Sequence, residues 1–221
     1  MSTQRIVAID LLRTLAIILM IVFHIAFDLQ TMYGWDIDVF RGGWDVLRLL
    51  TATIFIGIAG ITTHLTTHPY KRTLTIAAAA ALVTAATYMW DPETYVRFGI
   101  LHCIALTVLL LELLKPLRAL TVPLGILIIV AGNLFAGTTV HTSLLLPLGF
   151  PPPFFATLDY YPLLPWFGVA LIGYGFGFTS VIRMRNNPSP IIRLLTLPGR
   201  HTLLIYLLHQ PVIIGMLSFI L

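Results

Sequence analysis

Cysteine is almost missing from this sequence. Cys103 is the only cysteine among 221 residues, which excludes a disulfide within the chain and any metal site built on several cysteines. We therefore expect Cys103 to pack as a small apolar side chain, and we expect no metal cofactor.

Charged residues are scarce as well. They make up 10% of the chain, whereas hydrophobic residues make up 58%. With a mean hydropathy of +0.94, the composition lies outside the range of soluble globular proteins and inside that of polytopic membrane proteins. The net charge of +4 comes from basic residues scattered through short loops, a pattern that membrane topology explains better than nucleic-acid binding. We predict an integral membrane protein with no nucleic-acid partner.

Apolar runs separated by polar turns predict an all-α polytopic protein that forms one domain over residues 1–221. The seven expected transmembrane helices are 6–27, 44–64, 72–89, 99–115, 121–137, 163–182 and 201–221. The first run lacks a small-residue cleavage site, so we expect a retained helix and not a signal peptide. Lysine and arginine in alternate loops place the N-terminus in the cytoplasm and the C-terminus outside. Glycines in the sixth span predict close helix packing.

The first span carries ionisable residues although it is long enough to cross a bilayer. Four of them follow helical spacing on one face: Asp10, Arg13, His24 and Asp28. A charged group near mid-membrane costs about 2.5–3.5 kcal/mol and usually faces a bundle interior or a wet cavity. We therefore interpret this polar stripe as the wall of a path across the membrane. Simpler interpretations stay open, namely a structural Asp10–Arg13 ion pair and an Arg5 that snorkels to the interface.

A second polar group is expected at the outer side. The connection before the fourth span places Arg97 and His102 on the same side as His24. The long outer connection 138–162 is rich in proline and brings in Asp159, whose partner we expect to be Arg97 or His102. The alternative for His102 is a structural histidine near a helix start.

The final polar residues lie around the last span. Arginines gather in the cytoplasmic connection before it, at Arg183, Arg185, Arg193 and Arg200. They suit an anionic nucleotide or a lipid headgroup, although the positive-inside rule alone also places them there. Within the span, His209 lies near mid-membrane, one turn after Tyr206.

Three motifs, taken in order along the chain, point to a known family. They are Arg5-x4-Asp10-x2-Arg13-x10-His24, Asp159-Tyr-Tyr-Pro-Leu-Leu-Pro-Trp166 and Gly199-Arg-His-Thr-Leu-Leu-Ile-Tyr-Leu-Leu-His-Gln-Pro211. Together they resemble the small prokaryotic relatives of the heparan-alpha-glucosaminide N-acetyltransferase catalytic domain, over nearly the whole chain. The Arg13-x10-His24 spacing also resembles the wider group of transmembrane acyltransferases that modify extracytoplasmic sugars.

The resemblance implies acyl transfer in the prokaryotic cytoplasmic membrane. An acyl group, expected to be acetyl, would move from cytoplasmic acetyl-CoA or another acyl-CoA to an amine or hydroxyl of an extracytoplasmic sugar or glycolipid. Carried over by position, Arg13 would lie along the path of the CoA moiety and His24 would occupy the catalytic position.

Elementary chemistry agrees with that implication. Acyl transfer from a thioester needs a base to take a proton from the acceptor, and imidazole titrates close to working pH. His24 is the candidate base and Asp28 its orienting acid, while donors for the developing oxyanion are sought among His102, Arg97 and Tyr206.

We thus predict two sets of site residues. The catalytic set is His24, Asp28, His102, Arg97 and Asp159. The set that binds acyl-CoA is Arg5, Asp10, Arg13, Arg200, Tyr206 and His209.

Two rival functions stay open at this point. One is a small-solute or proton transporter with an Asp10, Arg13, His24 and His209 relay, although we see no internal repeat of the kind that many transporters have. The other is an assembly subunit with buried ion pairs. Whether the chain forms a homo-oligomer is also open.

Overall fold

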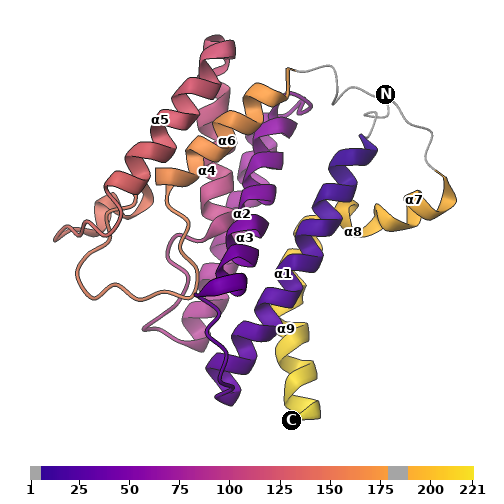
Figure 1. Ribbon diagram of the computed structural model, residues 1–221, viewed down its shortest axis with the longest axis vertical. Helices are drawn as coiled ribbons and strands as arrows, with labels where there is room; N and C mark the ends of the chain where they lie inside the picture. Colours follow the sequence, from indigo (N-terminus) through magenta and orange to yellow (C-terminus); the bar gives the residue numbers. More distant parts are fainter. Residues whose placement is uncertain (1–5, 179–188) are drawn as a thin grey trace. The chain divides into compact units, whose positions relative to one another are not determined.

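The computed structural model describes residues 6–178 and 189–221, which fold into helices joined by short connections (Figure 1). Within these ranges no strand forms, and one isolated bridge joins Phe98 to Tyr160. The predicted all-α class is confirmed. Arg5, Arg183 and Arg185 lie outside the described residues.

Nine α-helices and two 3-10 helices follow one another in the described ranges. The α-helices are α1 (Val7–Tyr33), α2 (Gly42–Thr63), α3 (Pro69–Trp90), α4 (Ile100–Leu113), α5 (Thr121–Leu134), α6 (Leu163–Phe176), α7 (Pro190–Leu195), α8 (Leu197–Arg200) and α9 (Thr202–Ile220). The 3-10 helices η1 (Lys115–Leu120) and η2 (Ser143–Leu148) lie in connections. α1 is longer than the expected 6–27 and ends at Tyr33, and the positive φ of 68° at the following Gly34 turns the chain away.

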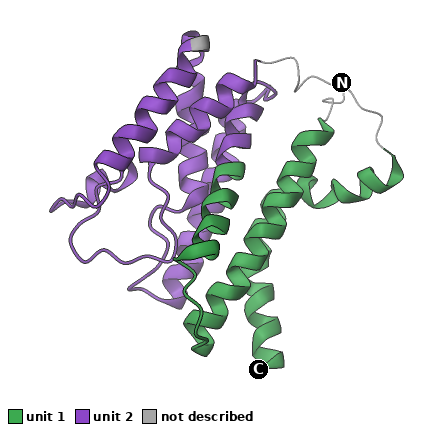
Figure 2. Ribbon diagram, in the orientation of Figure 1, with its two compact units in different colours: residues 1–55, 180–221 green, residues 56–179 purple. Residues whose placement is uncertain are grey.

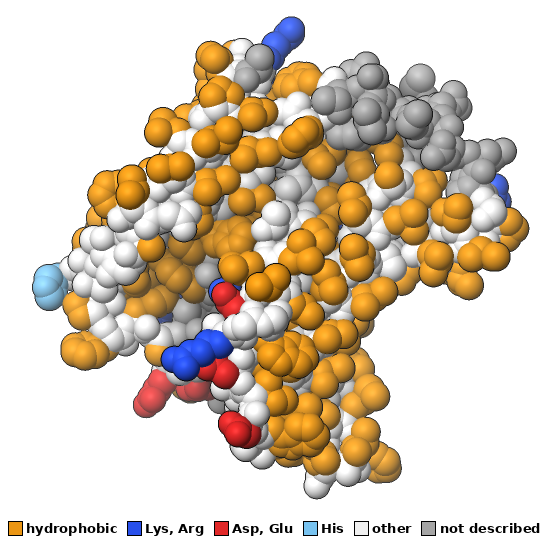
Figure 3. Space-filling model, viewed as in Figure 1, with side chains coloured by type: hydrophobic (Ala, Val, Ile, Leu, Met, Phe, Trp, Pro, Cys, Tyr) orange, Lys and Arg blue, Asp and Glu red, His pale blue; other side chains and the backbone are white. Residues whose placement is uncertain are grey.

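Among the described residues, four helices are long and apolar enough to cross a membrane: α1, α2, α3 and α9. α4, α5 and α6 have 14 residues each, so at about 1.5 Å per residue they extend roughly 21 Å, short of a hydrocarbon core of about 30 Å. They occupy the positions of the expected fourth, fifth and sixth spans. The count of seven crossings and the side of each terminus therefore stay predictions. Hydrophobic side chains dominate the face seen in Figure 3.

The chain divides into two compact units (Figure 2). Residues 1–55 and 180–221 form the first, and residues 56–179 form the second. The assignment of 1–221 to one domain stays a prediction.

The first unit is built on α1. α9 runs beside α1, and the short α8 contacts the N-terminal half of α1 (Figure 1). In the C-terminal half of α1, Phe23 and Ala26 form a small buried cluster with Val39 of the connection that follows. The backbone amide of Val39 donates to Oε1 of Gln30 at 3.1 Å, which holds the connection after α1 against that helix. As a result, residues near positions 195–210 become neighbours of residues near positions 10–28.

The second unit rests on helix pairs that approach closely. α5 packs along α6, and α3 packs along α4. A Cβ added at Gly125 of α5 would lie 2.7 Å from the carbonyl oxygen of Gly168 of α6, so neither position has room for a side chain. The close packing predicted from the glycines of the sixth span is confirmed in this helix pair.

Candidate active site

Both carboxylates of the predicted stripe on α1 are buried. Asp10 is 4% exposed and Asp28 is 2% exposed. Because a buried carboxylate without a partner is costly, each is expected to meet donors from another segment. Each meets a polar group from the chain between residues 195 and 210: the guanidinium of Arg200 lies near Asp10, and the amide of Gln210 donates to Asp28.

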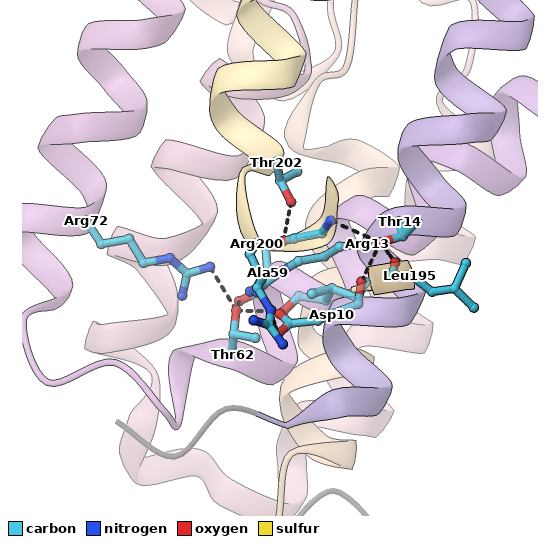
Figure 4. A network of polar contacts seen from close by, with 11 residues as sticks. Asp10, Arg13, Thr14, Ala59, Thr62, Arg72, Leu195, Arg200 and Thr202 are labelled. Carbon is cyan, nitrogen blue, oxygen red and sulfur yellow. Dashed lines mark hydrogen bonds and ion pairs between the residues drawn. The ribbon is translucent and has the colours of Figure 1, made fainter. Parts of the chain in front are cut away.

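Asp10 forms the centre of a charged cluster near the start of α1 (Figure 4). Nη1 of Arg13 lies 3.2 Å from Oδ1 of Asp10, and Nε of Arg200 lies 3.9 Å from Oδ2. The first contact is a hydrogen-bonded ion pair, whereas the second is too long for a hydrogen bond. Two guanidinium groups thus lie against one carboxylate. Their side chains stay 28% and 29% exposed, so a ligand can reach them.

A glycine allows Arg200 to come this close to Asp10. A Cβ at Gly199 would overlap the carbonyl oxygen of Asp10. The Gly199 amide donates to the hydroxyl of Thr14 at 3.0 Å. That hydroxyl in turn shares its proton between the carbonyl oxygens of Leu195, at 2.8 Å, and Asp10, at 3.0 Å. The turn before α9 is therefore held against α1 by the Thr14 hydroxyl, through hydrogen bonds that a side chain at position 199 would break.

His24 lies further along the same face and is half-buried. Its Nδ1 is 2.8 Å from the carbonyl oxygen of Met20. Because a carbonyl only accepts hydrogen bonds, the ring proton belongs on Nδ1 and the lone pair on Nε2. No residue in the described part of the chain forms a hydrogen bond to Nε2. His24 is therefore held in the tautomer that can accept a proton at its free edge.

A second histidine packs against His24. The rings of His24 and His209 have centroids 4.6 Å apart and meet edge to face at 83°. Nδ1 of His209 lies 2.5 Å from the carbonyl oxygen of Tyr206, which fixes the same tautomer as in His24. Nε2 of His209 is buried and has no hydrogen-bond partner among the described residues. The tyrosine ring itself contacts His209, with centroids 5.4 Å apart.

Asp28 has a partner that the sequence did not indicate. Nε2 of Gln210 donates to Oδ1 of Asp28 at 2.6 Å. The expected orienting contact between Asp28 and His24 is not formed in the described structure, and the Met20 carbonyl holds the histidine instead. The prediction of Asp28 as orienting acid is corrected on this point: the Met20 carbonyl, which the helix already fixes one turn away, accepts the hydrogen bond from Nδ1, and the amide of Gln210 donates to the carboxylate.

Asp159, in the second unit, caps a helix. Its Oδ2 accepts from the backbone amide of Ile100 at 2.9 Å, at the start of α4. A Cβ at the preceding Gly99 would overlap this carboxylate, so glycine there makes room for the cap. A carboxylate in this place satisfies an unpaired amide and complements the helix dipole.

His102 uses both of its ring nitrogens in the second unit. Nδ1 accepts from the amide of Gly99 at 3.2 Å, so the ring proton belongs on Nε2, which lies 3.3 Å from the hydroxyl of Thr84. That hydroxyl donates onward to the carbonyl of Val96 at 2.8 Å. This network favours the alternative of a structural histidine at a helix start.

Arg97 lies between two aromatic rings. Its guanidinium carbon is 5.0 Å from the ring centre of Tyr95 and 5.2 Å from that of Phe155. Nη2 donates to the carbonyl of Glu93 at 3.3 Å. The arginine thus joins the 91–99 connection to the long connection before α6. Tyr160 in the latter donates its hydroxyl to the carbonyl of Leu146 at 2.8 Å, and burial raises the pKa of Tyr160 to about 12.

The family described as "Heparan-alpha-glucosaminide N-acetyltransferase, catalytic" matches residues 5–211 of the chain. The chain belongs to this family. No curated protein and no solved structure gives a significant match. Membership implies a transferase activity, and the apolar helices agree with a membrane enzyme.

In this N-acetyltransferase family member, the predicted residues fall into separate groups. The first unit brings together Asp10, Arg13 and Arg200 in one cluster, and His24, Tyr206 and His209 in another. The second unit brings Asp159 and His102 to the start of α4 and places Arg97 on the adjoining connection. The described residues contain no group of three or more histidine, cysteine, aspartate or glutamate side chains suited to a metal ion.

Sequence reasoning missed Gln210. Its signal was available, because an amide inside an apolar span is itself rare and costly. The residue follows His209 directly, within the third motif, and the family match includes it.

Proposed function

We propose that this chain transfers an acetyl group from cytoplasmic acetyl-CoA to an amine or hydroxyl of an extracytoplasmic sugar or glycolipid, with His24 as the general base. Family membership supports the reaction class. The observation that carries the residue assignment is the 2.8 Å contact of His24 Nδ1 with the Met20 carbonyl. It leaves a lone pair on Nε2, at an atom with no hydrogen bond in the described structure.

The proposed step is a proton transfer coupled to acyl transfer. Nε2 of His24 takes a proton from the acceptor as the acceptor nitrogen or oxygen bonds to the acyl carbon. The carbon–sulfur bond of the thioester breaks, and the CoA thiolate leaves and takes up the proton from Nε2, which restores the base. The chain supplies the base and its orientation, and general-base catalysis of this kind is worth about 10²- to 10⁴-fold in rate.

The Asp10 cluster is the proposed binding site for the anionic end of the donor. Arg13 and Arg200 place two guanidinium groups at this end of α1, each of which stays partly exposed, and guanidinium groups suit the phosphate groups of CoA. Arg13 and His24 are eleven positions apart on α1, about 16 Å along the helix axis. A long donor such as acyl-CoA can therefore contact the arginine at one end and present its thioester near His24 at the other. Arg5 stays a predicted contact outside the described residues.

Two replacements of His24 test the base. His24→Asn keeps a side-chain amide that can donate to the Met20 carbonyl but has no basic nitrogen, whereas His24→Ala loses both. In proteoliposomes with acetyl-CoA and glucosamine, we expect both variants to lose at least about a hundredfold in transfer rate. Stabilisation by acetyl-CoA in a thermal-shift assay shows that each variant is folded. A His24→Asn protein that binds acetyl-CoA and keeps wild-type turnover removes His24 from the mechanism.

The ring contact between His24 and His209 favours a proton transporter as the second candidate, because two imidazoles in contact across α1 and α9 suit a relay. The two functions differ in ligand binding. An acetyltransferase is stabilised by acetyl-CoA, while a transporter at millimolar acetyl-CoA shows no shift and instead dissipates an imposed pH gradient.

A further inference from the structure

The seam between α1 and α9 contains a group of buried polar atoms that are all of one kind. Oδ2 of Asp28, Oε1 of Gln210 and Nε2 of His209 are buried and have no hydrogen-bond partner in the described part of the chain. The carboxylate and amide oxygens only accept, and Nε2 of His209 also accepts because its ring proton is on Nδ1. Buried acceptors without donors are rare in native structures and need an explanation.

The hydrogen bond between Asp28 and Gln210 ties two of these atoms together. Nε2 of Gln210 donates to Oδ1 of Asp28 at 2.6 Å. The two atoms without a partner, Oδ2 of Asp28 and Oε1 of Gln210, therefore belong to two side chains that are hydrogen-bonded to each other. Asp28 is one turn from His24 on α1, so the pair lies on the face that carries the proposed base. Asp28 is 2% exposed and His209 is 8% exposed, so bulk water does not solvate these atoms.

We propose that Asp28 and Gln210 bind the hydrogen-bond donors of the acyl acceptor, with Gln210 as a positioning residue that orients Asp28. The inference rests on the proposed function and adds to it the residues that hold the acceptor beside His24. A group of accepting atoms requires a ligand rich in N–H or O–H groups, which an ammonium or a polyhydroxylated ring supplies. The carboxylate of Asp28 attracts a cationic ligand such as an ammonium, which must give a proton to His24 before its nitrogen can bond to the acyl carbon.

The test compares how a substitution changes the steady-state KM for each of the two substrates. In Gln210→Leu both polar atoms of the side chain are removed, and the exposed Ser218→Leu on α9 is the matched control. With glucosamine and acetyl-CoA as the two substrates, we expect Gln210→Leu to raise the KM for glucosamine about 10- to 100-fold, the effect of losing a hydrogen bond to a charged group. We expect the KM for acetyl-CoA to stay within about twofold of wild type, and Ser218→Leu to change neither value.

Asp28→Asn distinguishes the two kinds of donor group. It keeps the size of the side chain and removes its charge. If the acceptor binds as an ammonium, Asp28→Asn weakens the binding of glucosamine more than that of methyl glucoside. If it binds through hydroxyls, the substitution weakens the binding of the two sugars equally. Either result supports the site.

Other outcomes overturn the inference. An unchanged KM for glucosamine in Gln210→Leu and in Asp28→Asn makes the pair structural, and a raised KM for acetyl-CoA alone assigns it to the donor. If Gln210→Leu loses the acetyl-CoA thermal shift, it has not folded, and Asp28→Asn then decides by itself. A wild-type chain that neither binds acetyl-CoA nor acetylates glucosamine refutes the proposed function and this inference together. A wild type that does both, with acceptor KM unmoved in the variants, refutes the inference alone.

Discussion

Replacing Gly199 by alanine tests whether the turn before α9 positions Arg200. The structure leaves no space at this position, because a Cβ would overlap the carbonyl oxygen of Asp10 and would lie 3.0 Å from the hydroxyl of Thr14. The obstacle is backbone, which cannot swing aside as the end of a flexible side chain can. Either α8 moves away from α1 or the helix deforms.

The expected cost follows from two terms. Overpacking a close contact costs about 1–3 kcal/mol. If the turn moves, the 3.0 Å hydrogen bond from the Gly199 amide to Thr14 is lost as well, at about 1 kcal/mol. A destabilisation of about 2–4 kcal/mol lowers the unfolding temperature by roughly 4–16 °C in a chain of this length. Arg200 would also move away from Asp10, so the affinity for acetyl-CoA should fall.

Gly215 provides a matched control on α9. A Cβ at this position has nothing within 4 Å, so alanine there should be neutral or should stabilise the helix by up to about 1 kcal/mol. Thermal unfolding in detergent, with and without acetyl-CoA, compares the two variants. If Gly199→Ala unfolds at the same temperature as Gly215→Ala and binds acetyl-CoA normally, the close contact between α8 and α1 is refuted.

Three further predictions concern separate parts of the chain. Arg13→Gln removes one guanidinium from the Asp10 cluster and should weaken acetyl-CoA binding at least about tenfold by calorimetry, and an unchanged Kd would return Arg13 to a structural role. Asp159→Ala removes the cap of α4 and should cost about 0.5–2 kcal/mol in unfolding free energy, so equal stability would contradict the capping role. Because the pKa of Tyr160 is raised to about 12, its contribution is complete below about pH 10 and is lost as pH rises toward 12. Tyr160→Phe should therefore reduce the alkaline loss of stability seen by thermal unfolding, and an identical pH profile would contradict this.

Helical periodicity revealed which face of α1 is polar, and this is the part of the site that sequence could predict. Asp10 and Arg13 are three positions apart, and the ion pair between them forms as the spacing allows. Periodicity reveals a face but not the segment that covers it. Arg200 and Gln210 come from more than 180 positions away, and Arg193 was an equally plausible partner by charge alone.

The partner of His24 shows a second limit of local reasoning. Met20 and Asp28 are each one turn from the histidine, on opposite sides, and both offer an oxygen. The carbonyl of Met20 is fixed in place by the helix itself, so no side chain loses conformational entropy when this carbonyl accepts the hydrogen bond from the ring. Asp28 instead meets a donor from α9, which no pattern within α1 could indicate. The partner of Asp28 is therefore set by a contact made elsewhere in the unit, whereas the tautomer of His24 is fixed within α1.

The polar contacts along α1 also fix the register of α9. His24 and Asp28, one turn apart, meet the consecutive residues His209 and Gln210. Sliding α9 by one turn, about 5.4 Å, would bring Tyr206 or Ile214 to the place of Gln210 and leave the buried carboxylate without its donor. Variants of the Asp28–Gln210 contact should thus alter stability as well as activity. Nε2 of His24 is different, because it makes no hydrogen bond in the described structure and so contributes nothing to the register. Removing this atom should therefore abolish activity and leave stability unchanged, and His24→Asn is the variant that tests the two effects separately.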